Sequence, residues 1–145
     1  MGKRTLVFVV AWLATFALGA TAATQVVLAF LESLGRTIPF GERAAAVAHD
    51  LGAMFPAYGG LLLIALLIAF PVVGLIVRGR PALRLVGYVV GGFVAVLALH
   101  LIMRSVLGMN PVWATGTPFG LLLQCLSGAV GGYLFARLQR PVVPA

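Results

Sequence analysis

The sequence has very few charged residues. Only 9% of its 145 positions are Asp, Glu, Lys or Arg, whereas 62% are hydrophobic. A water-soluble protein of this size needs a larger polar fraction to cover its surface. The composition therefore excludes an ordinary soluble globule and predicts a protein whose solvent is lipid.

Groups that commonly carry out chemistry are equally scarce. There are three acidic residues, two histidines and a single cysteine, Cys125, which lies inside an apolar run. One cysteine provides no disulfide framework and no CxxC metal or redox motif. No apolar segment carries paired carboxylates, which proton-coupled transporters commonly use. The sequence thus predicts neither a metal site nor a catalytic residue.

The positive charge does not indicate a nucleic-acid partner. The net charge is +7, from nine arginines and one lysine, but these residues are scattered in ones, twos and threes between apolar blocks. No basic stripe follows one face, as a nucleic-acid-binding surface requires. The excess of arginine over lysine, with abundant alanine and glycine, is typical of a GC-rich genome and favours a bacterial source.

Four apolar stretches are long enough to cross the roughly 30 Å hydrocarbon core of a bilayer, which takes ~20 helical residues. They are residues 6–31, 57–77, 85–103 and 119–138. Within lipid every backbone amide must be satisfied internally, which favours helices. The sequence therefore predicts an all-α, polytopic protein with one membrane domain over residues 1–145. Its architecture is a four-helix transmembrane bundle with outer loops at 32–56 and 104–118.

Charge predicts the orientation of this bundle. Seven basic residues fall on one side of the predicted membrane: Lys3, Arg4, Arg78, Arg80, Arg84, Arg137 and Arg140. The other side carries three basic residues and all three acids: Arg36, Arg43, Arg104, Glu32, Glu42 and Asp50. Because basic residues concentrate in cytoplasmic segments, both termini are predicted to be cytoplasmic, in a bacterial inner membrane.

The first span has a second interpretation. Lys3 and Arg4, the apolar stretch that follows and the triplet at residues 20–22 also resemble a secretory signal with an A-x-A cleavage site. The apolar run continues beyond the triplet through VVLAFL, which favours an uncleaved helix. Cleavage would leave three spans without reversing the others.

The first outer loop has a helical pattern of its own. Apolar residues recur at helical spacing, namely Phe40, Ala44, Val47, Ala48, Leu51, Met54 and Phe55. The charged and titratable residues Glu42, Arg43, His49 and Asp50 gather on the opposite face. This pattern predicts an amphipathic helix that lies on the outer membrane surface or caps the bundle.

Small residues at intervals of four predict where the helices pack, because helices in lipid associate through close backbone approach. Three rows are present: Gly120, Gln124, Gly128, Gly132 and Ala136; Gly87, Gly91 and Ala95; and Ala11, Thr15, Gly19 and Ala23. They face either helices of the same chain or another copy. Gln124 is predicted to form an interhelical hydrogen bond to a backbone carbonyl, since an unbonded amide in hydrocarbon costs several kcal/mol. Thr15, Thr21 and Gln25 add further polar contacts in the first span.

Two residues near the end of the third span raise the question of a ligand site. His100 and Arg104 lie one turn apart where the apolar run ends, and they are predicted to mark the membrane interface. A sharper alternative adds His49 and Asp50 from the first outer loop. Asp50 would pair with Arg104, and the two histidines would bind a b-type haem.

The size and span count are similar to several groups of small bacterial four-helix membrane proteins, including glutathione-linked membrane enzymes and short-chain multidrug exporters. The motifs of neither group are present; the exporters have a membrane glutamate in the first span, and here that span has no acid before Glu32. Packing features are abundant and reactive ones scarce. We therefore expect a non-enzymatic accessory or scaffold subunit that associates with the bilayer, with itself or with another membrane subunit. An oligomeric small-solute transporter or channel is the first alternative, and a haem- or quinone-linked redox protein is the second.

Overall fold

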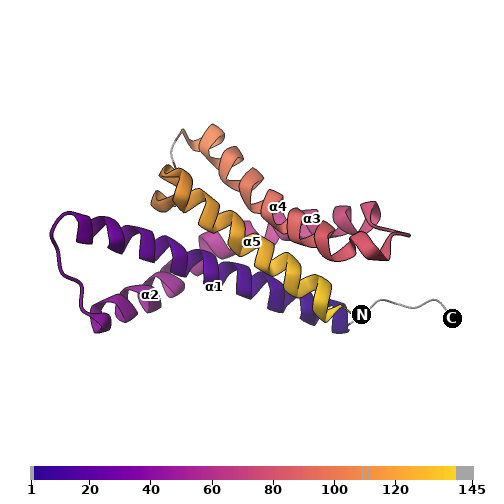
Figure 1. Cartoon of the computed structure of the whole chain (residues 1–145), viewed down its shortest axis with the longest axis horizontal. Helices are drawn as coiled ribbons and strands as arrows, with labels where there is room; N and C mark the ends of the chain where they lie inside the picture. Colours follow the sequence, from indigo (N-terminus) through magenta and orange to yellow (C-terminus); the bar gives the residue numbers. More distant parts are fainter. Residues whose placement is uncertain (1, 109, 111, 140–145) are drawn as a thin grey trace.

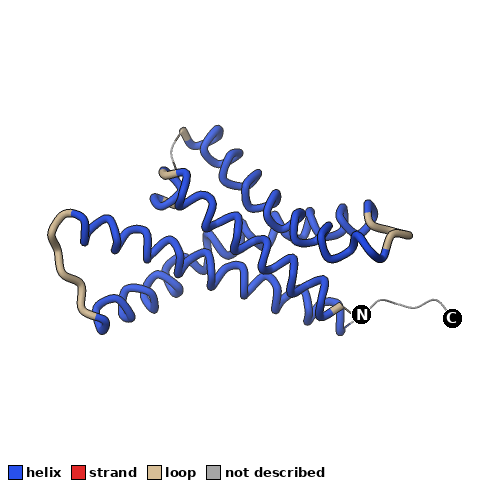
Figure 2. The backbone as a smooth tube through the Cα atoms, viewed as in Figure 1, coloured by secondary structure: helices blue, strands red, loops and turns tan. Residues whose placement is uncertain are grey.

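The chain folds into helices joined by short loops. The structure, a computed structural model, describes residues 2–108, 110 and 112–139; Arg140, one of the residues used to predict orientation, lies outside them. Figure 2 shows helix and loop throughout this part of the chain, with no strand in it. The predicted all-α fold class is thus confirmed for the described residues.

The described residues form five α-helices, which Figure 1 labels in chain order. They are α1 (Gly2–Ser33), α2 (Phe40–Met54), α3 (Gly60–Ile76), α4 (Arg84–Leu107) and α5 (Pro118–Leu138). A π-helical turn, Phe55–Gly59, joins α2 to α3, so that Phe40–Ile76 is one helical segment of 37 residues. Short 3₁₀ turns at Pro81–Leu83 and Trp113–Gly116 precede α4 and α5.

Four helical segments are long and apolar enough to cross a membrane: Gly2–Ser33, Phe40–Ile76, Pro81–Leu107 and Pro118–Leu138. Each covers one of the four predicted spans, except that Val77 lies just beyond the end of the second segment. The second segment extends furthest beyond the prediction, because α2 and the π-helical turn continue into α3. At 1.5 Å per residue, α1 is about 48 Å long, which exceeds the thickness of a bilayer's hydrocarbon core.

The helices run up and down, with α5 between α1 and α4 (Figure 1). The third helix packs against α4, and α2 turns back along the second half of α1. The start of α1, the turn between α3 and α4 and the end of α5 therefore share one end of the molecule, which we call the terminal end. The α1–α2 and α4–α5 loops lie at the opposite end, the loop end.

The tightest contacts are backbone to backbone, between α4 and α5. A Cβ added at Gly92 would lie 2.0 Å from the Gly128 carbonyl oxygen, and one at Gly132 would lie 1.9 Å from that of Tyr88. Both distances are far shorter than any real Cβ contact, so only glycine fits at these positions. Gly92 belongs to none of the predicted rows, because the residues four positions away on α4, Tyr88 and Val96, are not small.

The other predicted rows also face helices of the same chain. Gly87 and Gly91 of α4 lie against Val73 of α3 and against Val77, which directly follows α3. On α1, Ala11 has no exposed surface and packs towards α5, where Gly131 leaves room for it. Gly120 at the start of α5 lies against the 3₁₀ turn, since its Cβ would be 1.8 Å from the Ala114 carbonyl oxygen.

Aromatic side chains fill the interior at the terminal end. The ring of Phe70 lies 4.5 Å from that of Phe135 and 5.7 Å from that of Tyr88, measured between centroids. Phe8 contacts Phe70 edge-on at 5.9 Å. These rings join α1, α3, α4 and α5, so the bundle is held by aromatic packing where the glycine contacts end.

We expect Gly132→Ala to lower the free energy of unfolding in detergent by about 1–3 kcal/mol, because the new methyl group would collide with the backbone of α4. Gly60→Ala is the matched control, since a Cβ there meets nothing within 4 Å. It should leave stability unchanged or raise it slightly through helix propensity. Equal effects of the two substitutions would contradict the close approach of α4 and α5.

Candidate functional site

The centre of the bundle contains a buried polar cluster around Gln124. This side chain has no exposed surface. Its Nε2 donates a hydrogen bond to the Gly19 carbonyl oxygen at 2.8 Å, and its Oε1 accepts one from the Tyr58 hydroxyl at 2.5 Å. The amide therefore links α5 to α1 and to the π-helical turn before α3. In an apolar bundle such contacts specify which helices meet and in what register.

Gly19 is what allows this amide to approach α1. A Cβ at Gly19 would lie 2.7 Å from Gln124 Oε1 and 3.2 Å from the Ser127 hydroxyl oxygen. A larger residue would displace the Gln124 amide oxygen from its place against α1. The small residue and the amide thus form a single recognition unit across two helices.

Tyr58, the second partner of Gln124, was not identified in the sequence analysis. It is buried within the π-helical turn Phe55–Gly59. Pro56 has no amide proton, so it interrupts the regular hydrogen-bond ladder of the helix at this point. The π turn accommodates this interruption and directs Tyr58 into the core. The stretch FPAYGG could have indicated Tyr58, because a proline inside a helical segment disturbs the helix and π turns often occur at functional positions.

Two of the predicted polar residues of α1 have hydrogen-bond partners, one within α1 and one on α2. Thr15 is fully buried, and its hydroxyl donates to the Ala11 carbonyl oxygen of the same helix at 2.9 Å. Thr21 is half-buried. Gln25 Oε1 accepts a hydrogen bond from an Arg43 guanidinium nitrogen at 2.5 Å. Of these three, only Gln25 has a hydrogen bond to another helix among those described.

His100 faces the interior of the bundle and not the membrane interface. Only 4% of its surface is exposed, and its Nδ1 lies 2.8 Å from the Val96 carbonyl oxygen. Because a carbonyl oxygen can only accept, Nδ1 carries a proton and donates it to Val96. Nε2 has no hydrogen-bond partner among the described residues. The centroids of the His100 and Tyr58 rings are 5.8 Å apart.

Arg104 differs from His100 in its surroundings. It is exposed near the end of α4, in the last turn, where its charge complements the helix dipole. The sequence placed both residues in one interfacial zone, but four residues along α4 separate a buried imidazole from an exposed guanidinium. The structure therefore does not bring them into one site.

The remaining candidate ligands lie on α2. His49 is exposed, whereas Asp50 is half-buried and accepts a hydrogen bond from the Thr24 hydroxyl at 2.7 Å. Arg104 is not the partner of Asp50. With one histidine exposed on α2 and the other buried in the core, the arrangement gives no support to a haem held between them. Among residues 2–108, 110 and 112–139, no group of three His, Cys, Asp or Glu side chains could hold a metal ion.

Arg43 and Asp50 of α2 both bond to side chains of α1. This differs from the prediction, which placed the charged face of α2 opposite its apolar face. Arg43 pairs with Glu32 at 2.5 Å as well as with Gln25, and Asp50 is bound to Thr24. Helical spacing alone placed them opposite the apolar residues. The polar groups of α1 attract them instead, because each hydrogen bond satisfies a group that would otherwise be desolvated.

The buried cluster has the character of a structural contact. The hydroxyl of Ser127 donates to the Gln124 carbonyl oxygen at 2.7 Å, and Cys125 is buried beside it. The Gln124 amide, the Tyr58 phenol and the Ser127 hydroxyl each form a hydrogen bond. His100 Nε2 is the one buried side-chain nitrogen or oxygen in the described part of the chain that lacks a partner.

Comparison of the chain with protein-family models, with curated proteins and with solved structures finds no match. The described fold defines the class of protein: a small all-helical protein with four helices in its described residues that are long and apolar enough to span a membrane. Its interior is organised by glycine contacts and one buried amide.

The hydrogen bond between Tyr58 and Gln124 should appear in a double-mutant cycle on stability in detergent. For Tyr58→Phe and Gln124→Leu we expect a coupling energy of about 0.6–1.7 kcal/mol, from the average to the maximum measured for interhelical hydrogen bonds in a membrane bundle. Thr15→Val serves as the control partner, because the Thr15 hydroxyl bonds only within α1. It should be additive with Tyr58→Phe to within roughly 0.5 kcal/mol. A coupling no larger than the control would show that the amide does not join the two helices.

Proposed function

We propose that this chain is a multi-pass protein of a bacterial inner membrane that acts as a non-enzymatic accessory or scaffold subunit. It binds a helix of another membrane subunit through one face of α2. The proposal rests on a contrast within the molecule, between rows of small residues that are already covered and one row that is open.

The open row lies on α2. Gly41, Ala44, Ala45, Ala48 and Gly52 are all exposed, and their spacing places them within about a third of the helix circumference. A Cβ added at Gly41 or Gly52 would meet nothing within 4 Å. We call these five residues the α2 open face. They extend over about three helical turns, enough for close contact with another helix.

Nothing in the described part of the chain covers this face. No residue of α2 is buried, although α2 belongs to a helical segment with the composition of a span. By contrast, every small-residue row in α1, α4 and α5 is filled by a neighbouring helix of the same chain. A helix that packs one side against α1 and leaves a small-residue side free is suited to bind a partner.

Charge supports the proposed orientation. The terminal end carries six basic residues in the described part of the chain, which are Lys3, Arg4, Arg78, Arg80, Arg84 and Arg137. The loop end has Arg36, Arg43 and Arg104 together with all three acids. By the positive-inside rule both termini are cytoplasmic. The amphipathic α2 then lies towards the outer membrane surface, where its open face would meet a partner.

The state of the polar groups favours a scaffold over a transporter. A solute pathway needs polar side chains that are free to exchange partners. Thr24, Gln25 and Gln124 instead bond to Asp50, Arg43 and the Tyr58–Gly19 pair. The polar half of α1 is therefore used to hold α2 in place.

The double substitution Ala48→Leu, Gly52→Leu tests the proposal, because two bulky side chains would block close approach to the open face. After gentle extraction from host membranes, native mass spectrometry should show the wild-type chain bound to a defined second subunit. We expect the double variant to lose at least nine-tenths of that complex while its thermal stability is unchanged.

Ala82→Leu is the matched control, since Ala82 is also exposed but lies at the terminal end. It should retain the complex. If the wild-type chain forms only a homo-oligomer that the double variant loses, the partner is a second copy. A complex that survives in the Ala48→Leu, Gly52→Leu double variant would contradict the proposed function. A chain that is monomeric in its own membranes would contradict it too.

A further inference from the structure

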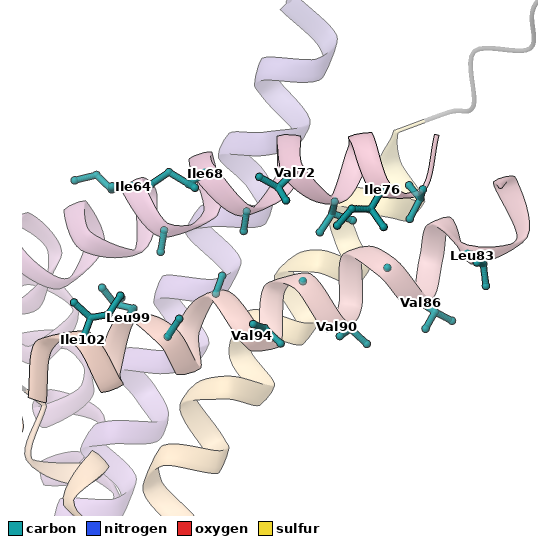
Figure 3. Close-up of a pocket in the computed structure, with 18 of the residues that line it drawn as sticks. Ile64, Ile68, Val72, Ile76, Leu83, Val86, Val90, Val94, Leu99 and Ile102 are labelled. Atoms are coloured by element: carbon teal, nitrogen blue, oxygen red, sulfur yellow. The ribbon is translucent and has the colours of Figure 1, made fainter. Parts of the chain in front are cut away.

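An apolar groove runs between α3 and α4, away from the α2 open face. Figure 3 shows it bordered by Ile64, Ile68 and Val72 of α3 and by Val90 and Val94 of α4. Its volume is about 780 Å³, and every lining residue is Leu, Ile, Val, Ala or Gly. A groove without one polar side chain cannot recognise a polar solute, so its occupant must be aliphatic where it touches these helices.

The length of the groove matches a membrane dimension. Its lining on the segment Pro81–Leu107 extends from Leu83, at the end of the 3₁₀ turn, to Ile102 of α4, which corresponds to about 29 Å of helix. This is close to the full hydrocarbon thickness of a bilayer. A lipid acyl chain that enters from either surface therefore finds apolar wall along its whole length.

The groove is better suited to a flexible chain than to a helix. Its two central glycines are already occupied, since Gly91 lies against Val73 and Gly87 against Val77. The rim consists of exposed branched side chains, such as Ile68. Another helix could not approach closely over this rim, and close approach is what drives helix association in lipid. An acyl chain can follow an irregular surface and needs no such approach.

Positive charge surrounds one end of the groove. Arg78 and Arg80 are exposed in the turn between α3 and α4, next to the lining residues Val77 and Leu83. Arg84 follows them and donates to Gln139, a neutral partner. The two ion pairs of the described residues lie at the loop end, and the chain's three acids lie between positions 32 and 50. Among the described residues, Arg78 and Arg80 thus have no acidic side chain as a partner at the terminal end.

We propose that this groove is a binding site for an anionic phospholipid. One acyl chain lies along α3 and α4, and the headgroup phosphate sits at Arg78 and Arg80. Basic residues at the membrane surface favour anionic over zwitterionic headgroups, and the apolar groove holds the tail. The site is independent of the α2 open face and of any partner bound there.

Native mass spectrometry of the full chain in detergent tests this site with two lipids of identical acyl chains, phosphatidylglycerol and phosphatidylcholine. The wild-type chain should bind phosphatidylglycerol at least tenfold more tightly. Replacing both headgroup contacts, Arg78→Gln and Arg80→Gln, should weaken phosphatidylglycerol about thirtyfold and leave phosphatidylcholine unchanged. Arg104→Gln, which removes an exposed arginine at the loop end, should change neither affinity.

A second pair of variants tests the tail. Val90→Phe with Val94→Phe narrows the groove and should weaken both lipids, whereas Val130→Phe on the exposed side of α5 should weaken neither. The proposal is overturned by equal binding of the two lipids or by an arginine pair that behaves like Arg104→Gln. It is also overturned if Val90→Phe with Val94→Phe leaves the binding of both lipids unchanged, because the lipid would then be adsorbed to the surface. A lipid-free dimer of the wild-type chain that these two substitutions abolish would overturn it as well.

Discussion

The close approach of helix backbones is the constraint on which the rest of this structure depends. Apolar side chains gain little by leaving lipid for one another, so a bundle in a membrane must obtain its stability from contact distance and hydrogen bonds. Here the backbones of α4 and α5 approach closely at two places, where Gly92 meets Gly128 and where Gly132 meets Tyr88. These contacts fix α5 in the middle of the bundle, and the central position of α5 brings Gln124 within reach of both α1 and Tyr58.

The buried amide has a different role from the glycines. Glycine rows let helices slide along one another, because one small residue resembles the next. Gln124 removes this freedom, since its amide reaches one carbonyl and one hydroxyl at a single register. Ion pairs and hydrogen bonds then hold α2 against α1 at the loop end, most directly through Arg43 with Glu32. The fold thus uses glycine for proximity and polar groups for specificity.

Much of this fold could be predicted from the sequence, because hydropathy fixes helix number and small-residue spacing fixes the contact faces. The row around Gln124 predicted a bond to a backbone carbonyl, and Gln124 does donate to Gly19. The partners of polar groups could not be predicted, since they depend on how the helices are arranged. Tyr58 was missed because a π turn directs it inwards, and His100 was placed at an interface because distance along a span does not reveal which side faces the core.

The central claim is that the chain's own packing surfaces are filled internally and that α2 provides the one contact face for a protein partner. A photo-crosslinking amino acid placed at Ala48, and separately at Val130 on the exposed side of α5, tests this claim in living cells. The account predicts a discrete intermolecular product from position 48 and none from position 130. A product from position 130 with none from position 48 would place the partner on α5 and contradict the account.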